Sequence, residues 1–388
     1  MTTTTRLALI PRDGLFCKDG RGWHTSASGR GHGLDWPWPS TVLGALRSCW
    51  GRNEETRSGA TFSPSDWRTR TAPMRLGRTL VLRRKHGAAW CVEDATWPVP
   101  LDALWLEGRT EVHRLEPMQI SAPTLGRDDD DSREGLMRPV LDGVGKPLVA
   151  PRWWNRKDFS AWLAGQAVAV QSHEDALATT RRVQVRVGIR PEELTSDDGV
   201  LFSHDVVETL DLSGEWSIGV EVTLPAGALS NIATLGSDSR LARVESLSAA
   251  FFEPPAQVLD AFRSSSHGLR VVAATPLFFE NGWLPDGLAE NGGSYRGRLI
   301  GIEHEVILRA AFVPRPIHVS GWDMAKGEPK PTSRMVPPGA VYFFERADGK
   351  AFGEAEARSL WLAALGTRTD EGFGHVVPGV WRPARNNP

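Results

Sequence analysis

Between residues 182 and 190 the side chains alternate between two chemical kinds. The aliphatic positions are Val183, Val185, Val187 and Ile189, and the polar positions are Arg182, Gln184, Arg186 and Arg190. A period of two is the repeat of a β-strand, with the two kinds on opposite faces. Asp198-Gly199 predicts a turn that returns the chain through residues 200–202. The segment therefore predicts a β-hairpin with an aliphatic face and an arginine face.

Strands recur along the chain and are interrupted by few helices. Further strands are expected at 6–10, 216–224, 271–274, 306–312 and 341–344. One helix is expected from Ser40 or Thr41, which can cap its first amides, to Gly51, which can end it. Others are expected at about 158–165, 257–263 and 354–365. Strands interleaved with few helices make the fold class α+β.

The length of the chain favours two domains. At 388 residues it exceeds the usual size of a single hydrophobic core. Pro254-Pro255 breaks the strand pattern before the next helix, which places the boundary near residue 250. We expect an N-terminal domain at 1–250, with an insertion at about 113–180, and a C-terminal domain at 251–388.

Composition and cysteine usage limit the class of protein. The 40% hydrophobic and 24% charged residues are ordinary for a soluble globular protein, and no apolar run approaches the roughly 20 residues that cross a bilayer. The chain has three cysteines, which is an odd number, and no two of them form a Cys-x-x-Cys pair: Cys17, Cys49 and Cys91. This argues against a disulfide framework and against a thiolate zinc site. We expect a cytoplasmic protein without membrane contact.

The net charge of the chain does not by itself indicate a nucleic-acid partner. The sum is −2, but a basic stripe on one face can bind phosphate whatever the total. Sixteen tryptophans against two tyrosines are unusual. The favoured interpretation is that most of them are anchors in the core or at subunit interfaces. The alternative is that they are platforms for base stacking.

The first candidate binding site is the start of the helix after Trp36-Pro37-Trp38-Pro39. A helix N-terminus presents free N–H groups and a partial positive charge, so it can receive a phosphate. Ser40 and Thr41 add hydroxyl donors. Gly44 permits close approach, and Arg47 supplies a bidentate cation one turn later. An ordinary capped helix packed on a sheet is the alternative, and it is favoured when this segment is taken alone.

The second candidate site is the glycine turn at residues 235–242. Gly236 and Ser237, with Arg240 close behind, can form a nest of main-chain donors that suits an anion. A tight turn between two elements explains the same residues equally well.

The third candidate site is the loop from Ser320 to Arg334. Prolines stiffen it, and Trp322 is available for stacking on a base. Lys326, Lys330 and Arg334 can follow a sugar–phosphate backbone. The alternative is a solvated loop with one anchoring tryptophan.

No catalytic, metal or cofactor set is convincing. His24, His32 and Asp35 suggest acid–base work on an RNA 2′-hydroxyl, but nothing in the sequence fixes a partner for them. The Asp128 to Asp131 run is more often solvated than a metal site. Walker, Rossmann, His-Glu-x-x-His and Gly-x-Ser-x-Gly patterns are absent. We therefore expect a protein that is not an enzyme and needs no metal or cofactor.

A series of short motifs runs through the chain in a fixed order. They are Pro11-Arg12-Asp13-Gly14-Leu15-Phe16 with Lys18-Asp19-Gly20, Trp36-Pro37-Trp38-Pro39-Ser40-Thr41 with Gly44-Ala45-Leu46-Arg47, Arg186-Val187-Gly188-Ile189, Leu235-Gly236-Ser237 with Arg240-Leu241, Gly321-Trp322-Asp323 with Pro329-Lys330-Pro331, Pro338-Gly339-Ala340-Val341-Tyr342-Phe343-Phe344, and Gly372-Phe373-Gly374. Each is weak alone. Together they resemble the third Cmr subunit of type III-B CRISPR effector complexes, within the repeat-associated mysterious protein (RAMP) superfamily. The loop between Cys17 and Trp38 departs from the family by its length and its Gly, Ser and His content.

The resemblance implies two ferredoxin-like, RRM-type domains, with a long insertion or thumb in the first. It implies a subunit that caps the 5′ handle of the CRISPR RNA (crRNA), beside the large polymerase-like subunit and the first backbone RAMP subunit. Cutting the guide is not the role of this family, and target RNA is met only indirectly, because the backbone subunit cuts it. A β-hairpin thumb typically kinks the guide. Residues 186–202 or the segment 113–150 could supply it, and the sequence does not choose between them.

Sequence and resemblance together give a hypothesis for RNA contact. The 5′ handle would run along the interface between the two domains, with phosphates on amides near Gly236 and at the start of the Ser40 helix. Arg47, Arg186 and Arg240 would add charge-assisted bonds. The expected set is completed by Thr41, Gly44, Ser237, Trp322, Lys326, Lys330, Arg334, Gly372, Phe373 and Gly374. Two rivals stay open: a metal-independent RNA endonuclease of the same superfamily, and a structural adaptor that touches protein only.

Overall fold

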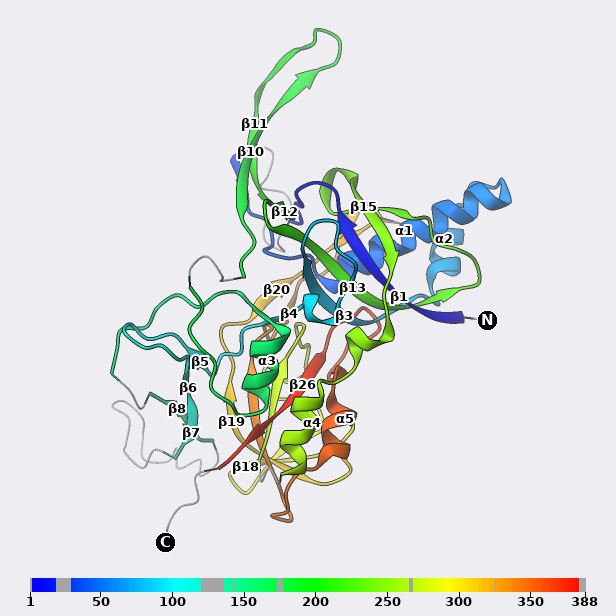
Figure 1. Cartoon of the computed structure of the whole chain (residues 1–388). Coiled ribbons are helices and arrows are strands. Elements are labelled where there is room, and N and C mark those ends of the chain that lie inside the picture. The colour runs from blue at the N-terminus through cyan, green and yellow to red at the C-terminus, as the bar shows by residue number, and fades with distance from the viewer. Residues whose placement is uncertain are drawn as a thin grey trace.

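The computed structural model describes residues 2–18, 29–119, 136–141, 144–172, 177–264, 268–324 and 326–383. Within them the fold is mixed, with more strand than helix, as the sequence predicts. Most strands belong to two large antiparallel sheets (Figure 1). His24 and the Asp128 to Asp131 run lie outside the described residues.

The first large sheet comes from the N-terminal part of the chain. Its strands follow the order β14 (Ile232–Leu235), β15 (Arg240–Ser246), β1 (Thr2–Pro11), β13 (Gly214–Pro225), β3 (Arg75–Arg84), β4 (Ala95–Pro98) and β9 (Trp153–Asn155), and β12 (Leu210–Asp211) pairs with β13. Ile218, Val220 and Val222 alternate along β13 and are buried in the core that this sheet forms with helix α1 (Pro39–Ser58). The period of two in β13 therefore predicted a buried face correctly.

Helix α1 begins earlier than the sequence predicted. Trp38 is its N-cap, Pro39 is the first helical residue, and no side chain caps the helix. The expectation that Ser40 or Thr41 is the cap is therefore wrong. Proline suits the first helical position because its φ is already helical and its missing N–H would have no partner inside the helix.

Helix α1 also ends later than predicted. It runs to Ser58, and Gly59 follows in the left-handed region with φ of 65°. Gly51 lies inside the helix, where a Cβ would come within 2.0 Å of the ring of Trp67 in α2 (Pro64–Thr71). Gly51 is needed for packing between helices, so the prediction that it ends α1 is wrong.

The second large sheet comes from the C-terminal part. Its strands follow the order β17 (Leu288–Asn291), β18 (Ser294–Gly297), β19 (Val306–Phe312), β24 (Val341–Arg346), β16 (Gly268–Ala273), β26 (His375–Trp381) and β25 (Ala363–Ala364). The helices that share its core are α3 (Arg156–Leu163), α4 (Ala256–Arg263) and α5 (Glu354–Leu360). Helix α5 is shorter than predicted because Leu362 has φ of 54° and the chain then enters β25.

Tryptophan is mainly a core residue in this fold. Ten of the fifteen tryptophans that the structure describes are buried, among them Trp97, Trp154 and Trp162 at 1% exposure each. Trp97 stacks on Phe159 with ring centroids 5.0 Å apart, and Trp154 meets Trp162 edge-on. The favoured interpretation of these residues as anchors is confirmed.

The hairpin of β10 (Arg181–Arg190) and β11 (Thr195–Val207) stands away from both sheets (Figure 1). Strand β2 (Gly29–Gly31) pairs with β11 in parallel. The turn is at residues 191–194, where Leu194 has φ of 55° and donates to Arg190 O at 2.8 Å. Asp198-Gly199 lies inside β11, so the predicted turn position is wrong. Pro191, which has no N–H for a strand ladder, stops β10 first.

The two faces of this hairpin are those predicted, but the aliphatic face is the exposed one. Val183, Val185 and Ile189 are 49%, 64% and 53% exposed. Gln184 and Arg186 are half-buried on the opposite face, which turns toward the first sheet. An apolar strand face that lies outside the core is uncommon in a globular protein.

Short elements fill the remaining described chain. They are β5 (Ala103–Leu104), β6 (His113–Arg114), β7 (Glu116–Met118), β8 (Arg138–Val140), β20 (Ile317–Val319), β21 (Trp322–Asp323), β22 (Glu328–Pro329), β23 (Ser333–Met335) and the 3-10 turns η1 (Val92–Asp94), η2 (Ser237–Ser239) and η3 (Ala249–Phe252). Among the described residues, no helix has the length and apolar character needed to cross a membrane.

Candidate nucleic-acid interface

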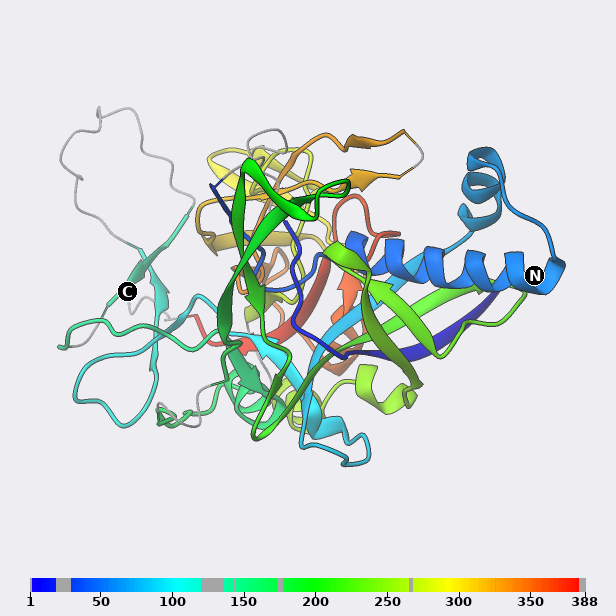
Figure 2. The same ribbon diagram turned by 90° about the horizontal axis from the view of Figure 1, so that it is seen from above.

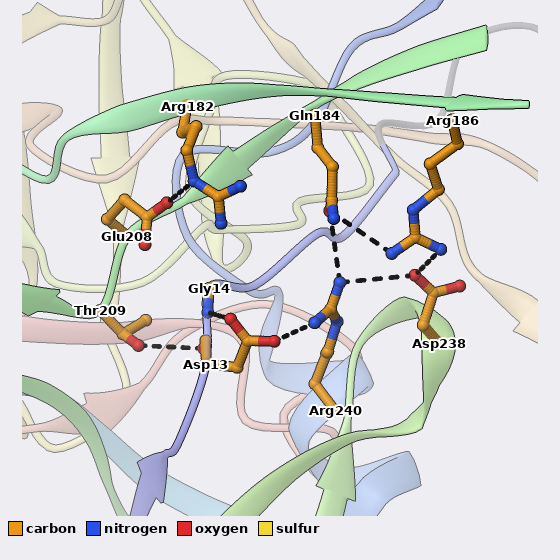
Figure 3. A network of polar contacts seen from close by, with 9 residues as sticks. All are labelled: Asp13, Gly14, Arg182, Gln184, Arg186, Glu208, Thr209, Asp238 and Arg240. Carbon is orange, nitrogen blue, oxygen red and sulfur yellow. Dashed lines mark hydrogen bonds and ion pairs between the residues drawn. The ribbon is translucent and has the colours of Figure 1, made fainter. Parts of the chain in front are cut away.

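Arg186 and Arg240, distant in sequence, meet beside strand β10 of the β10–β11 hairpin (Figure 3). Arg186 Nη1 lies 2.7 Å from Asp238 Oδ2, and Arg240 Nη2 lies 3.7 Å from the same oxygen. Gln184 Oε1 accepts hydrogen bonds from both guanidinium groups, at 3.4 and 3.3 Å. The strand period explains this, because Gln184 and Arg186 share one face of β10.

Asp13 supplies a second carboxylate to the same cluster. It pairs with Arg240, while its Oδ1 accepts from Gly14 N at 2.7 Å and its main-chain oxygen accepts from Thr209 Oγ1 at 3.1 Å. We call Asp13, Gln184, Arg186, Asp238 and Arg240 the arginine network. Its side chains are partly exposed, with 31% for Arg186 and 42% for Asp238, so a ligand can reach them.

The expected main-chain nest at Gly236 is used inside the protein. Ser237 N donates to Phe16 O at 2.8 Å. Gly236 has φ of 74°, and a Cβ there would lie 2.9 Å from that same Phe16 oxygen. The glycine permits a close contact with the first segment of the chain, and the Ser237 amide does not hold an anion in this conformation.

The start of α1 presents fewer free main-chain N–H groups than the sequence suggested. Thr41 N and Val42 N both donate to Trp38 O, at 2.9 and 3.3 Å, and Pro39 has no N–H. Ser40 and Thr41 are half-buried there. The dipole and the hydroxyl groups of the first turn are present, but the set of free amides is smaller than expected.

Gly44 and Arg47 lie on the next turn of α1. Gly44 is exposed, and no heavy atom lies within 4 Å of where its Cβ would be. Arg47 Nη2 donates to Met74 O at 3.3 Å, and its Nε is buried without a partner among the described residues. Burial lowers the pKa of Arg47, and nearby Arg75 lowers it further, against the opposing effect of Glu371.

The loop at Gly372-Phe373-Gly374 brings the C-terminal part of the chain to the start of α1. A Cβ on Gly372 would lie 2.9 Å from Pro39 Cβ. Phe373 is fully buried in a small core with Val319 and Met335, so it is not a stacking platform. Gly372 N and Gly374 N donate to carbonyl oxygens of this chain. In this conformation the two amides and the ring of Phe373 are used inside the protein, and the expected RNA contact of these three residues stays a prediction.

The hairpin of β21 and β22 carries the third candidate set. Trp322 is 44% exposed, and Lys326 Nζ lies 3.5 Å from Glu328 Oε1. Lys330 N donates to Gly321 O at 2.8 Å, which closes the hairpin. Arg334 lies on β23, opposite His318 of β20. In Figure 2 this hairpin (orange) and α1 (blue) both extend from the body on the same side.

Helix α1 links the arginine network to the other sets. Asn53 Nδ2 donates to Ala228 O at 2.8 Å, and Cys49 Sγ lies 3.4 Å from Ile232 O. Residues nearer the start of α1 therefore lie beside residues nearer the end of β14, which Gly236 follows. The helix start and the network lie at the same end of this packed pair.

Comparison with known proteins identifies the family. A family model described as CRISPR-associated protein (Cas_Cmr3) matches residues 7–381. This chain belongs to the Cas_Cmr3 family. The resemblance drawn from the ordered motifs is therefore confirmed. No curated protein matches this Cas_Cmr3 sequence.

Solved structures similar to this Cas_Cmr3 chain include two cryo-EM structures of the type III-B Cmr-beta. The one bound to cognate target RNA and AMPPnP (state 1) contains a chain with 12% identity and a TM-score of 0.42, covering 87% of this chain and 86% of that chain. The one bound to cognate target RNA contains a chain with 13% identity and a TM-score of 0.41, covering 88% and 86%.

Two of the three residues considered for catalysis in this Cas_Cmr3 member, His32 and Asp35, are described, and both are paired with other groups. His32 Nδ1 lies 3.6 Å from Asp205 Oδ2, and Asp35 pairs with both Arg152 and Arg181. Burial raises the pKa of Asp35, but the two guanidinium groups outweigh it and leave that pKa below its usual value. Within the described ranges, no group of three or more His, Cys, Asp or Glu side chains is placed to hold a metal ion.

Sequence reasoning missed the acidic half of the Cas_Cmr3 arginine network. Gln184 could have been found, because it is in phase with Arg186 on β10. Asp13 and Asp238 carried no comparable signal, since the pairing of Asp13 with Arg240 depends on how β1 and β15 lie together in the sheet, and the pairing of Asp238 with Arg186 depends on where β10 lies.

Proposed function

We propose that this protein is a non-catalytic subunit of a type III-B CRISPR RNA-guided effector complex that works in antiviral defence. It binds the 5′ handle of the crRNA and joins the large polymerase-like subunit to the first backbone subunit. Membership of the Cas_Cmr3 family supports the assembly. The convergence of Arg186 and Arg240 on Asp238 carries the RNA contact. Two ferredoxin-like (RRM-type) domains, one around each large sheet, belong to the same proposal.

Phosphate binding at the arginine network is an exchange of partners. Arg186 and Arg240 are held by Asp238 and Asp13 when no strand is bound. Guanidinium groups bind phosphate by charge-assisted, often bidentate hydrogen bonds. An incoming phosphate takes over these donors, and the displaced carboxylates turn to solvent, because Asp238 and Asp13 are 42% and 49% exposed.

The strand then continues toward the start of α1. Arg47 and the open surface at Gly44 lie on that route. Lys326, Lys330 and Arg334 on the β20–β23 region supply further cations from the C-terminal part. The handle thus follows the junction between the two sheets.

The β10–β11 hairpin is the better candidate for the thumb. It projects from the body as a two-stranded arm (Figure 1), and its strand β10 carries Gln184 and Arg186 of the arginine network. The described parts of 113–150 form two short strand pairs, one of which packs against β19 of the second sheet. The exposed aliphatic face of the arm suits an apolar surface of a neighbouring subunit.

Guide binding by an arginine variant tests the proposal. In Arg186→Ala/Arg240→Ala, we expect weaker binding of a handle RNA and a salt slope lower by roughly 1.4, at ~0.7 per lost phosphate contact on a single strand. The matched control is Arg263→Ala/Arg358→Ala, which also removes two arginines that share one carboxylate, that of Glu354. Equal affinity and equal slope in the two variants would contradict the proposal.

The two rivals have their own tests. Incubation of the purified chain with repeat RNA in EDTA would show a discrete cut if it were a metal-independent endonuclease, and we expect none. Crosslinking from the 5′ end of the guide in the assembled complex would leave a protein-only adaptor unlabelled, whereas we expect label near the arginine network.

A further inference from the structure

Strand β10 of the hairpin arm has an outer edge to which no other described strand pairs. The small sheet of the arm has the order β10, β11, β2, so β10 lies at one side of it. In an antiparallel pair, alternate residues direct their N–H and C=O groups away from the partner strand. Between Arg182 and Val187, the described backbone makes no hydrogen bond other than those to β11. The outer edge is therefore a row of main-chain donors and acceptors that can receive another strand.

This edge lacks the features that usually prevent strand addition. Native proteins protect such edges with proline, with bulges or with a covering element. From Arg181 to Val187 the strand has no proline and pairs with β11 in regular register, and the first irregularity comes between Val187 and Ile189. Strand β2 supports the arm only opposite Phe202 to His204 of β11. The outer part of the arm is thus a two-stranded ribbon, which is marginally stable in water and would be stabilised by a third strand.

The aliphatic face of the arm lies beside this edge. Val183 and Val185 of β10 are 49% and 64% exposed, and Leu201 of β11, opposite Val187, is 62% exposed. Side chains that face each other on neighbouring strands have Cβ atoms about 5 Å apart. An added strand with aliphatic residues on this face would therefore cover the valines and remove apolar surface from water.

The opposite face of β10 selects the charge of the added strand. Arg182 and Arg186 lie on that face, and their side chains are 51% and 31% exposed. Opposite charges on neighbouring strands attract, whereas like charges are destabilising. A second copy of β10, paired with its aliphatic face on the same side, would bring further arginines next to these two. Charge complementarity thus disfavours self-pairing and favours a strand with acidic residues on this face.

We propose that the outer edge of β10 binds an extended strand of a neighbouring protein subunit by β-strand addition. The added strand alternates aliphatic residues, which cover Val183 and Val185, with acidic residues, which lie beside Arg182 and Arg186. Main-chain hydrogen bonds supply the affinity in this mode of recognition, and the alternating side chains supply the specificity. This inference rests on the assembly part of the proposed function and adds how one partner is held.

Hydrogen–deuterium exchange tests the strand pairing. Exchange is measured residue by residue in the full-length chain alone, in the chain with guide RNA, and in the effector complex reconstituted with all its subunits. We expect alternate amides between residues 182 and 187 to exchange about tenfold or more slowly in the complex than with guide RNA alone, because a hydrogen-bonded amide exchanges only after local opening. The intervening amides, already bonded to β11, should change less.

Lysine variants test the apolar contact. In Val183→Lys/Val185→Lys, we expect incorporation into the complex to weaken by about tenfold or more, because two ammonium groups would lose water at the contact. The matched control is Leu210→Lys/Leu212→Lys, which changes two exposed leucines at the β12–β13 hairpin and should be incorporated like the wild type. The valine variant should still bind handle RNA, because the arginine network lies on the opposite face of β10. Thermal unfolding confirms that both variants are folded.

The outcomes separate this inference from the proposed function. Normal incorporation of the valine variant, with the outer amides unprotected in the complex, overturns the strand pairing and leaves the proposed function intact. Loss of incorporation without amide protection assigns the valines to an ordinary apolar contact and also overturns it. Protection by guide RNA alone would place RNA at this edge, and protection that grows with the concentration of the free chain would place a second copy there; either result overturns the inference. A wild-type chain that does not enter the complex overturns both the inference and the proposed function.

Discussion

At the scale of single residues, the proposed RNA contact depends on the partners that Arg186 and Arg240 already have inside the protein. Arg186 and Arg240 are paired before any strand arrives, so binding has to replace bonds to Asp238 and Asp13. Internal carboxylates lower the affinity for any anion. They also keep the guanidinium groups ordered and pointing at one place, which favours a ligand that presents phosphates at the matching spacing.

Removing the shared carboxylate tests this exchange. In Asp238→Asn, we expect a few-fold tighter binding of handle RNA, because a partly exposed ion pair of ~0.2–1 kcal/mol no longer competes. Asp260→Asn, which removes one of the two carboxylate partners of Arg263 elsewhere on the surface, is the control and should leave binding unchanged. Weaker binding in Asp238→Asn would show that the carboxylate orders the arginines more than it competes.

His375 links the two sheets and makes stability depend on pH. The ring is buried, with Nε2 2.8 Å from Gly77 O and Nδ1 3.1 Å from Leu362 O. Burial lowers the pKa of His375 below its usual value, and the carbonyl contacts oppose this only in part. The unfolded chain therefore takes up a proton first as the pH falls below about 6.5.

We expect the free energy of unfolding to fall as the pH drops through this window, by at most ~1.4 kcal/mol per pH unit for one proton. In His375→Gln this part of the pH dependence should be missing. Denaturant unfolding between pH 7 and pH 5 measures it, and identical slopes in the two proteins would contradict the assignment.

At the scale of elements, two glycines of α1 have opposite roles. A Cβ on Gly51 would clash with the ring of Trp67, whereas a Cβ on Gly44 would have no heavy atom within 4 Å. Glycine inside a helix is less favourable than alanine by about 1 kcal/mol, so a glycine that persists there has a packing or binding reason. For Gly51 the reason is the contact between α1 and α2.

Alanine at each position separates packing from helix propensity. We expect Gly51→Ala to destabilise the protein by about 1–3 kcal/mol, since overpacking outweighs the gain in propensity. Gly44→Ala on the same helix should stabilise it by up to about 1 kcal/mol. Thermal or denaturant unfolding compares the two, and a stabilised Gly51→Ala would mean that α2 moves away at little cost.

At the scale of the whole molecule, a buried ion pair joins the segment after β4 to the second sheet. Arg270 Nη1 lies 2.6 Å from Asp102 Oδ2, with exposures of 1% and 0%. Asp102 also accepts from Trp162 Nε1 of α3 at 2.9 Å. Because the partners come from separate parts of the chain, this pair fixes how those parts sit together.

Breaking this pair on one side should be costly. We expect Asp102→Ala to lose about 3–5 kcal/mol of unfolding free energy, because it leaves the Arg270 cation buried and uncompensated. Asp102→Leu/Arg270→Met, which removes both charges, should be closer to the wild type than Asp102→Ala. A double variant that is less stable than Asp102→Ala would contradict the explanation that the loss in the single variant comes from an uncompensated buried charge.

Much of the local structure was predictable from the sequence. The period of two fixed the strand character of β10 and β13, and the ordered motifs were sufficient to identify the family. The position of turns and helix ends was less predictable. The chain turns at Pro191 to Leu194, before it reaches Asp198-Gly199. Helix α1 continues through Gly51, which packs against the ring of Trp67, although a glycine often ends a helix.

The sequence by itself determined which residues alternate, which can turn and which carry charge, because these properties depend on near neighbours. Only the tertiary structure decided that the aliphatic face of β10 is exposed, that Phe373 is buried and that Asp13 and Asp238 hold the arginines. These outcomes depend on residues up to hundreds of positions apart meeting in one place. Local periodicity carries no information about such meetings, so the acidic partners of the site appear only in the folded chain.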